Sequence, residues 1–334
     1  MRAVRLRIWR RAPGSGVPAA LALLGLAYAY TFSGLGASLI RAAVETTPPL
    51  MFAALRGALT ASLFLAVFGA RGKLRLPAWA DAPAFLATGV LSFAVSHLLV
   101  ATALVTTTAS QASLVQAAGP VLTATFGAVL LMERPPRVQV VSLGLSLLGT
   151  ILMSEPLATL TQAGRATLSG NLLVLLAISA DALAVVLAKG LRRRYDAPMV
   201  ATWTYSIGAL SLLLVALWQY QGVGLARLSP QGALAVGYMG IMVGFFGYLA
   251  WIWAMGHSTV VVAGSVMYIQ PLAGVAGGIV LLGETLNLWV VLGGSLVLAG
   301  LTLFLWSISP RSRQVRGAPP EPQASLPANE RSAR

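Results

Sequence analysis

The sequence predicts an all-α integral membrane protein with ten transmembrane helices, arranged as two inverted five-helix repeats with both termini cytoplasmic. Three observations lead to this fold class. The chain holds ten long apolar stretches, its basic residues gather between alternate stretches, and one Pro-to-Glu segment occurs twice at a fixed offset. An odd number of helices in each repeat makes the second repeat enter the membrane from the opposite side.

The composition is that of a membrane protein. Of the 334 residues, 57% are hydrophobic and only 10% are charged, whereas soluble globular chains carry about 25% charged residues. Glycine is abundant, with 34 residues, as in many membrane helices. The formal net charge of +14 lies in short clusters between apolar runs. This pattern favours a lipid-bilayer partner and argues against nucleic acid.

A spanning helix needs about 20 apolar residues, and ten stretches approach or exceed that length. The first five cover residues 18–40, 49–70, 80–104, 110–132 and 138–154, and the last five cover 169–190, 198–219, 232–254, 258–281 and 287–308. The first stretch follows a basic segment that resembles the start of a secretory signal. Its apolar run is long for a signal peptide and nine more stretches follow, so we predict a retained helix. The fifth stretch is the shortest.

The distribution of lysine and arginine along the chain predicts the orientation in the membrane. With the N-terminus in the cytoplasm, the cytoplasmic segments hold all but four of the 23 basic residues. The exceptions are Arg41, Arg165 and Arg227 in outer loops and Arg56 within the second stretch. This bias predicts that both termini are cytoplasmic. The resulting domains are a basic N-terminus (1–17), a first repeat (18–154), an extracytoplasmic connecting loop (155–168), a second repeat (169–308) and a disordered cytoplasmic tail (309–334).

The repeat is clearest in two segments. GPVLTATFGAVLLME runs from Gly119 to Glu133 and QPLAGVAGGIVLLGE from Gln270 to Glu284, each with a proline thirteen residues before a glutamate. The offset of 151 residues also aligns Gly57-Ala58-Leu59 with Gly208-Ala209-Leu210. Inverted repeats are typical of secondary transporters, in which two halves exchange conformations around a central site. A duplication kept only for packing is the alternative.

These segments resemble the EamA-type transporters of the drug/metabolite transporter superfamily. YLAWIWAMGHSTVVVAGSVMYIQP at 248–271 and PPLMFAALRGALTA at 48–61 add to the resemblance, which extends over about 18–308. It implies a small-molecule carrier without ATP hydrolysis, whose cavity is lined mainly by helices 1, 3, 4, 6, 8 and 9 and flanked by helices 5 and 10. The chain departs from the family pattern at Arg134-Pro135-Pro136 and at an aspartate in the sixth stretch.

That aspartate, Asp181, is the first candidate for the substrate pathway. A carboxylate at the bilayer centre costs about 2.5–3.5 kcal/mol, so we expect Asp181 to face protein or a water-filled cavity. It could bind a cationic substrate group or a proton, or only tie helices together. Its repeat partner is Tyr30. His97, whose repeat partner is Tyr248, could serve a proton step or bond a neighbouring helix.

Aromatic and amide side chains supply further pathway candidates at membrane depth: Gln116, Trp203, Tyr205, Trp251, Tyr268 and Gln270. An aromatic pocket with few charges suits amphipathic or zwitterionic molecules such as amino acids, or organic cations. Many such rings simply pack between helices.

Five residues are hinge or gate candidates. Pro120 and Pro271 each free a backbone carbonyl inside a helix, which predicts hinges or cavity-facing kinks. Glu133 and Glu284 lie at helix ends, where each could anchor the end or act as a gate. Arg56 could attract a substrate carboxylate, snorkel outward, or bond helix carbonyls. The resemblance favours a structural role, by snorkelling or by bonding carbonyls, over attraction of a substrate.

The chain lacks catalytic and metal-binding sequence motifs. It has no cysteine, only two histidines, and no Walker A, HExxH or GxSxG motif, so we expect no enzyme activity, no metal site and no cofactor. We predict an exporter of a small organic metabolite in the cell inner (plasma) membrane, working by alternating access. Proton coupling through Asp181 or His97 and uniport are both consistent with the sequence. A channel-like facilitator and a non-transporting scaffold or sensor are the alternatives, and the Gly274/Gly278 face could pack internally or form a homodimer.

Overall fold

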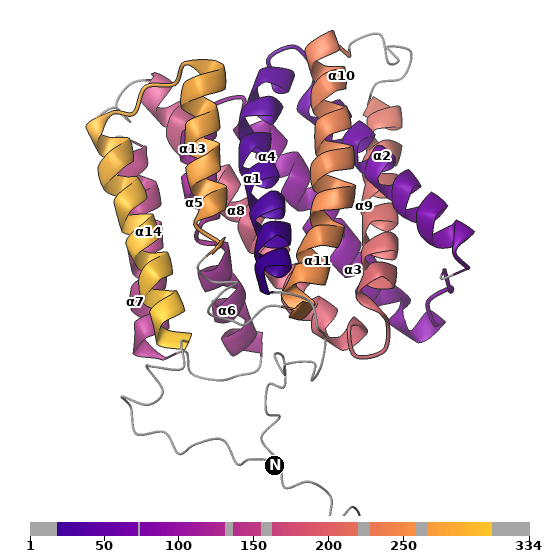
Figure 1. Ribbon diagram of the computed structural model, residues 1–334. Coiled ribbons are helices and arrows are strands. Elements are labelled where there is room, and N and C mark those ends of the chain that lie inside the picture. The colour runs from indigo at the N-terminus through magenta and orange to yellow at the C-terminus, as the bar shows by residue number, and fades with distance from the viewer. Residues whose placement is uncertain are drawn as a thin grey trace, which may run out of the picture.

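The computed structural model describes residues 19–72, 74–130, 136–154, 162–219, 228–257 and 266–308. Within these ranges all regular structure is helical, and the helices form one bundle (Figure 1). The predicted all-α class is therefore confirmed. Eight helical stretches are long and apolar enough to cross a membrane, and two shorter apolar helices, Arg137–Met153 and Ile269–Leu282, accompany them in this part of the chain.

The first half is described by these elements: α1 (Ala19–Val44), α2 (Pro49–Ala70), the short 3-10 turn η1 (Trp79–Asp81), α3 (Ala82–Gly89), η2 (Val90–Val95), α4 (Ser96–Ala103), α5 (Ala109–Gln116), α6 (Gly119–Leu130) and α7 (Arg137–Met153). The second half contains α8 (Gln162–Leu191), α9 (Ala197–Gln219), α10 (Pro230–Gly237), η5 (Tyr238–Gly247), α11 (Tyr248–His257), α13 (Ile269–Leu282) and α14 (Leu288–Ile308). Helix α8 begins at Gln162, ahead of the predicted start at 169, because its first turns are polar and carry no hydropathy signal.

Irregularities occur at matching places in the two halves. The π-helix η2 lies between α3 and α4, and the π-helix η5 lies between α10 and α11. The two π-helices occupy corresponding positions at the 151-residue offset. A turn at Ala117–Ala118 separates α5 from α6, and a turn at Met267–Tyr268 precedes α13. Both turns lie just before a proline, which removes a helical hydrogen bond and clashes with the preceding turn. The repeat is therefore visible in backbone geometry.

Contacts at the two ends of the bundle show that the halves run in opposite directions. At one end, Arg41 late in α1 donates to the carbonyl of Thr107, whose hydroxyl donates to Asn171 early in α8. At the other end, Arg194 after α8 pairs with Asp81 before α3 at 2.6 Å. Helices α1 and α8 are therefore antiparallel. The described chain begins and ends at the same end of the bundle (Figure 1).

The two halves interleave. Helix α1 packs against α10, η5, α11 and α13 of the second half, and α8 packs in the same way against α3, η2, α4 and α6 of the first. Helices α2 and α9 pair with each other, as do α7 and α14. Helix α1 of the first half thus packs within the second half, and α8 of the second half packs within the first. Any central site therefore contains residues of both halves.

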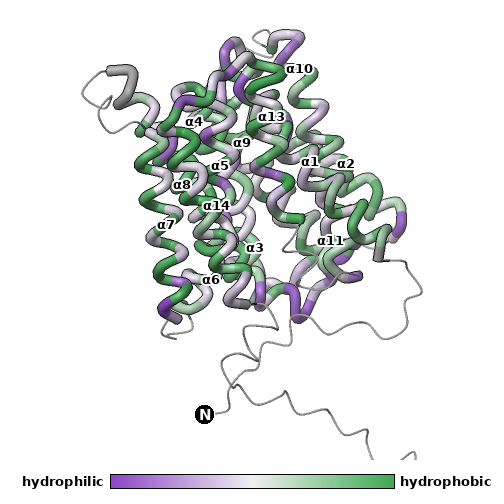
Figure 2. Tube along the Cα trace, turned by 60° about the vertical axis from the view of Figure 1, so that its left-hand side comes forward, coloured by the Kyte–Doolittle hydropathy of each residue, from purple (hydrophilic) through white to green (hydrophobic). Residues whose placement is uncertain are grey.

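The outer surface is apolar along the helices and polar at the two ends (Figure 2). Leu148, Leu176 and Leu210 on three different helices are 55%, 56% and 57% exposed. Exposing such apolar side chains to water is unfavourable, whereas lipid tails can surround them without that cost in free energy.

Glycines set the closest helix contacts. A Cβ added at Gly149 of α7 would lie 2.5 Å from the carbonyl oxygen of Gly293 of α14, and one at Gly293 would lie 2.5 Å from that of Gly149. The predicted small-residue face of α13 also packs inside the chain: a Cβ at Gly274 would overlap the Ser113 side chain of α5, and one at Gly278 would overlap that of Ser110. That face serves internal packing, and the structure lends no support to a homodimer through it.

Candidate functional site

A cavity of about 420 Å³ lies between the two halves. Its lining comes from α1 to α5 and from α8, α9, η5, α11 and α13, whereas α7 and α14 contribute no residue among those described. The volume falls within the range of small-molecule sites. The flanking position of α7 and α14 agrees with the expected place of helices 5 and 10, while α2 and α9 enter the lining in addition to the helices expected there.

Most of the predicted pathway residues meet in this cavity. It is lined by Tyr30, His97, Gln116, Asp181, Tyr205, Tyr248, Trp251 and Gln270, together with Arg56, which the sequence placed among the hinge and gate candidates. These side chains come from both halves, so the pathway is assembled only when the repeats interleave.

Asp181 of α8 reaches the cavity beside η2. The Ser92 hydroxyl donates a hydrogen bond to Oδ1 of Asp181, and no described residue forms an ion pair with this carboxylate. Arg192, one residue beyond α8, also lines the cavity and acts on Asp181 through its charge. Arg192 is exposed, so it marks a cavity wall that reaches the surface at the α8 C-terminal end.

His97 is held by the irregular backbone of η2. Its Nδ1 lies 3.0 Å from the carbonyl oxygen of Ser92 and 3.1 Å from that of Phe93. Carbonyl oxygens only accept, so Nδ1 carries the proton. The ring stacks on Phe93 with centroids 4.4 Å apart. These contacts agree with the interpretation of His97 as a hydrogen-bonded histidine, and Nε2 has no hydrogen-bond partner among the described residues.

Arg56 of α2 brings a cation into the wall. Its side chain is only 5% exposed, and its Cζ lies 5.9 Å from the centre of the Phe93 ring. The Nε atom is buried and has no hydrogen-bond partner among the described residues. Neither ion pair found in this part of the chain involves Arg56. The guanidinium is therefore a buried charge without a protein counter-ion there.

Aromatic rings form a continuous wall between these charged groups. Tyr205 lies against Phe93 at 4.8 Å and against Tyr248 at 5.6 Å between ring centroids, and Tyr248 lies 6.0 Å from Trp251. The Trp251 indole donates to the Tyr30 hydroxyl at 3.4 Å. Such a wall offers π faces and phenol hydroxyls to a bound molecule.

Other predicted residues lie elsewhere. Trp203 donates to the carbonyl of Arg75 at 3.0 Å, and the Tyr268 hydroxyl donates to Thr302 of α14 at 2.9 Å, so neither lines the cavity. Pro120 and Pro271 are in the first turns of α6 and α13, next to the helix breaks. Glu133 lies outside the described residues.

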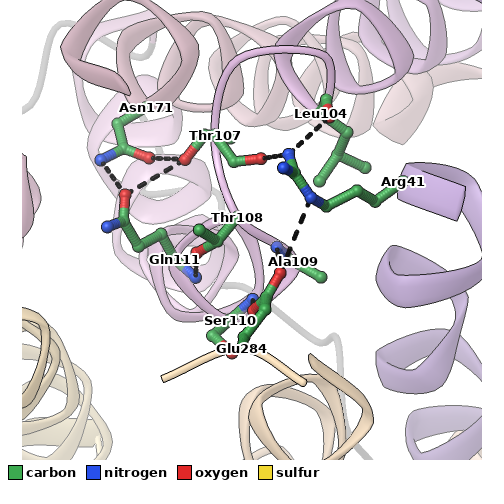
Figure 3. A network of polar contacts seen from close by, with 9 residues as sticks. All are labelled: Arg41, Leu104, Thr107, Thr108, Ala109, Ser110, Gln111, Asn171 and Glu284. Atoms are coloured by element: carbon green, nitrogen blue, oxygen red, sulfur yellow. Dashed lines mark hydrogen bonds and ion pairs between the residues drawn. The ribbon is translucent and has the colours of Figure 1, made fainter. Parts of the chain in front are cut away.

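Glu284 links the two halves at the end of the bundle where α1 ends, away from Arg192 (Figure 3). Its carboxylate accepts hydrogen bonds from the backbone N–H groups of Ala109 at 2.7 Å and Ser110 at 2.9 Å, the first residues of α5. Arg41 lies 3.8 Å away and also donates to the carbonyls of Leu104 and Thr107. One acidic residue of the second half is thus bound to a helix N-terminus and a cation of the first, as the helix dipole favours.

A buried amide network adjoins these contacts (Figure 3). Asn171, which is 0% exposed, donates to Gln111 at 2.9 Å and to Ser154 at 2.8 Å and accepts from Thr107 at 2.5 Å. Sequence reasoning missed Asn171, Gln111, Arg41, Ser92 and Arg192 as site residues. A polar amide near the start of the sixth apolar stretch was the available signal for Asn171.

An inverted pair of interleaved helical repeats around a central cavity is typical of secondary transporters. The EamA-like transporter family model matches this chain twice, over residues 20–155 and 168–306. The chain therefore belongs to the EamA-like transporter family. The two matches correspond to the two repeats, and the resemblance drawn from the Pro-to-Glu segments is confirmed.

Curated relatives agree with this family. An uncharacterized transporter of Archaeoglobus fulgidus is 28% identical over 270 residues, covering 80% of this chain and 92% of the relative. The uncharacterized transporter YdfC of Bacillus subtilis is 26% identical over 257 residues, covering 76% and 81%. A protein of known crystal structure shares the fold with a TM-score of 0.56 at 21% identity, over 85% of this chain and 95% of its own.

Family membership settles the broad class. The protein is a multi-pass transporter of the plasma membrane, and its family is one of transporters and not of enzymes. The names of these relatives specify no substrate.

Proposed function

We propose that this protein is a secondary carrier that exports a small organic molecule from the cytoplasm by alternating access. The carrying observation is a central cavity between inverted halves, which the exposed Arg192 lines at one end of the bundle, while Glu284 binds the two halves together at the opposite end. A carrier needs such a site open to one side at a time.

The proposed topology has ten transmembrane helices with both termini cytoplasmic. Helix α7 has 17 residues and packs along the 21-residue α14, which supports counting it as a span. The basic residues Arg192, Arg193 and Arg194 follow α8, at the bundle end away from the Glu284 network. The positive-inside bias makes that end cytoplasmic, so the cavity of this conformation faces the cytoplasm.

The inverted repeat places corresponding Arg and Glu residues in both halves, so the cavity could be closed at either end in turn. At the 151-residue offset Arg41 corresponds to Arg192 and Glu284 corresponds to Glu133, so the sequence contains the same Arg/Glu combination in both repeats. If the halves exchange conformations, each combination closes the cavity at its own end in turn. This correspondence supports a carrier over a channel, which needs no alternation.

Counterflow into liposomes tests the proposal. The purified full-length chain is reconstituted, loaded with unlabelled solute and exposed to trace labelled solute from panels of neutral amino acids, organic cations and small carboxylates. A carrier shows saturable uptake that internal solute accelerates. Flux without saturation or counterflow would replace the proposal with a facilitator. No flux from any panel, with the protein folded, would favour a scaffold or sensor.

The same liposomes test proton coupling, with Asp181 as the candidate group. A coupled carrier responds to an imposed pH gradient, and Asp181→Asn abolishes that response while counterflow persists. A uniporter shows no response in either protein. Loss of both activities in the variant would assign Asp181 to substrate binding.

A further inference from the structure

We infer that the surface formed by Arg71, Arg75, Leu76 and Trp79 binds an anionic phospholipid of the surrounding bilayer. We call it the loop surface, because it belongs to the segment that joins α2 to η1 and α3. None of the four residues lines the central cavity. The inference therefore goes beyond the proposed carrier function and does not depend on which solute is carried.

Two large apolar side chains of the loop surface are almost fully exposed. Leu76 is 83% exposed and Trp79 is 93% exposed. Trp79 begins η1, which runs directly into α3, and Pro83 and Leu86 follow it at helical spacing and are also exposed. Positions i, i+4 and i+7 share one face of a helix. Trp79 therefore continues the exposed face of α3 to the end of the span, where tryptophan rings lie at the level of lipid headgroups.

Two arginines give the loop surface its positive charge. Arg71 directly follows α2, Arg75 lies four residues later, and both are exposed. Neither forms an ion pair among the described residues. The carboxylate at the end of the loop, Asp81, is already bound, because it pairs with Arg194 at 2.6 Å and accepts a hydrogen bond from the Tyr195 hydroxyl at 2.7 Å. Both guanidinium groups are therefore available to an external anion.

The backbone of the loop is held against the second half of the chain. The Trp203 indole donates a hydrogen bond to the carbonyl of Arg75 at 3.0 Å, and the N–H group of Ala78 donates one to the Tyr195 hydroxyl at 3.0 Å. These bonds fix the main chain on both sides of Leu76, while the side chains of the loop surface stay exposed. A fixed backbone loses less conformational entropy when a ligand binds.

An anionic phospholipid matches both the charged and the apolar part of the loop surface. Its phosphate accepts hydrogen bonds from guanidinium groups, its net charge is attracted to arginines next to the membrane, and its acyl chains cover the apolar side chains. A zwitterionic phospholipid offers the same chains, but its own cation offsets the phosphate charge. A free phosphate offers the charge without the apolar contact. The loop surface therefore favours the anionic lipid over both.

Native mass spectrometry of the full-length protein in detergent tests the inference, because it counts the lipid molecules bound to each protein. The probes are phosphatidylglycerol and phosphatidylcholine with identical acyl chains. We expect the first phosphatidylglycerol to bind at least ~10-fold more tightly than the first phosphatidylcholine, since each arginine near the bilayer surface contributes about fivefold in affinity. An excess of inorganic phosphate should leave the bound phosphatidylglycerol in place.

Variants assign the binding to the loop surface. Arg71→Gln with Arg75→Gln should lower the affinity for phosphatidylglycerol at least ~10-fold and leave that for phosphatidylcholine unchanged. Trp79→Ala should weaken both lipids alike, because it removes apolar contact only. Arg137→Gln with Arg193→Gln is the control, since it removes the same charge from two exposed arginines outside the loop surface and should change neither affinity. The thermal midpoint in lipid-free detergent should be the same for all variants, which shows that each is folded.

Three results would overturn the inference. Equal affinity of the natural protein for the two lipids would remove the preference for an anionic headgroup. An equal loss in the control would assign the attraction to net charge and not to this surface. Displacement of phosphatidylglycerol by inorganic phosphate would leave a site for free anions. Solute counterflow is measured separately, so failure of the lipid site leaves the carrier proposal standing, and the reverse also holds.

Discussion

Single polar side chains hold the two halves together at one end of the bundle. Glu284 is bonded to two backbone N–H groups of α5 and lies beside Arg41. Because the carboxylate and its three partners belong to different halves, the carboxylate has to leave them whenever this end opens. Hydrogen bonds to a charged acceptor each contribute about 1.5–3 kcal/mol. Its removal should therefore shift the balance between the closed and open ends.

Glu284→Gln should open the end that Glu284 closes. The chain has no cysteine, so Ser33→Cys in the cavity wall is a unique label site. In intact cells we expect a membrane-impermeant maleimide to label this cysteine at least about tenfold faster when Glu284→Gln is also present, since the lost interactions exceed about 1.4 kcal/mol. Glu45→Gln, an exposed carboxylate at the same end, is the matched control. Equal rates with and without Glu284→Gln would contradict a gate.

Asn171 should be important for stability. It makes three side-chain hydrogen bonds at full burial, and Asn171→Ala removes all three, each worth about 0.5–1.5 kcal/mol. We expect a markedly lower thermal midpoint in detergent. Ser62→Ala, whose exposed hydroxyl bonds only the carbonyl of Leu59, should leave the midpoint unchanged. A similar midpoint for both variants would show that water replaces the network.

At the scale of elements, the helix breaks and the glycine contacts have different roles. The breaks before α6 and α13 lie beside the cavity residues Gln116 and Gln270, where freed backbone can line a cavity and absorb motion. The glycines at the α7–α14 crossing lie outside the cavity and allow two backbones to touch. Substitutions should therefore affect transport rate at the breaks and stability at the crossing.

Pro271→Ala tests the break. Alanine restores an N–H that can bond the carbonyl of Met267 and straighten the helix, so we expect counterflow to slow several-fold while solute affinity is kept. Pro83→Ala is the control, because Pro83 also lies in a first helical turn, that of α3, but away from both helix breaks and outside the cavity lining. Unchanged counterflow in Pro271→Ala would show that the break is not a hinge.

Gly149→Val tests the crossing. The new side chain would overlap the backbone of Gly293, and overpacking costs about 1–3 kcal/mol or more. A lower thermal midpoint is expected, whereas Gly144→Val on the same helix, where a Cβ meets nothing within 4 Å, should behave like the natural protein. Equal midpoints would mean that α7 and α14 separate readily.

At the scale of the whole molecule, the inverted and interleaved repeats give the two ends of the bundle the same design, while most basic residues gather at one of them. Helices α1 and α8 each insert into the other half, so neither half forms the cavity alone. The basic residues then determine which end faces the cytoplasm. Orientation is thus a property of the complete chain.

Reporter fusions test that orientation. A fluorescent protein that folds only in the cytoplasm should be bright after Arg334, and alkaline phosphatase, active only outside, should be active in the 155–161 segment. Phosphatase activity at the C-terminus would reverse the proposed orientation and place the Glu284 network in the cytoplasm.

Much of the fold was predictable because lipid imposes length and hydropathy on each helix. The ten apolar stretches, the proline breaks and the repeat register all follow from local composition and spacing. The π-helices η2 and η5 were not predicted, because no residue type marks them. Trp203 and Tyr268 were placed in the pathway on residue type and depth alone, whereas packing turns one toward Arg75 and the other toward α14.

The sequence by itself determined the membrane class, the family, the duplicated plan and most of the side chains that line the cavity, since these depend on composition and spacing along the chain. Only the tertiary structure decided that Arg56 faces the cavity without a counter-ion among the described residues and that Glu284 bonds α5 and Arg41 across the repeats. Hydropathy does not say which face of a helix meets which neighbour, and contacts between residues far apart in the chain exist only after the halves interleave.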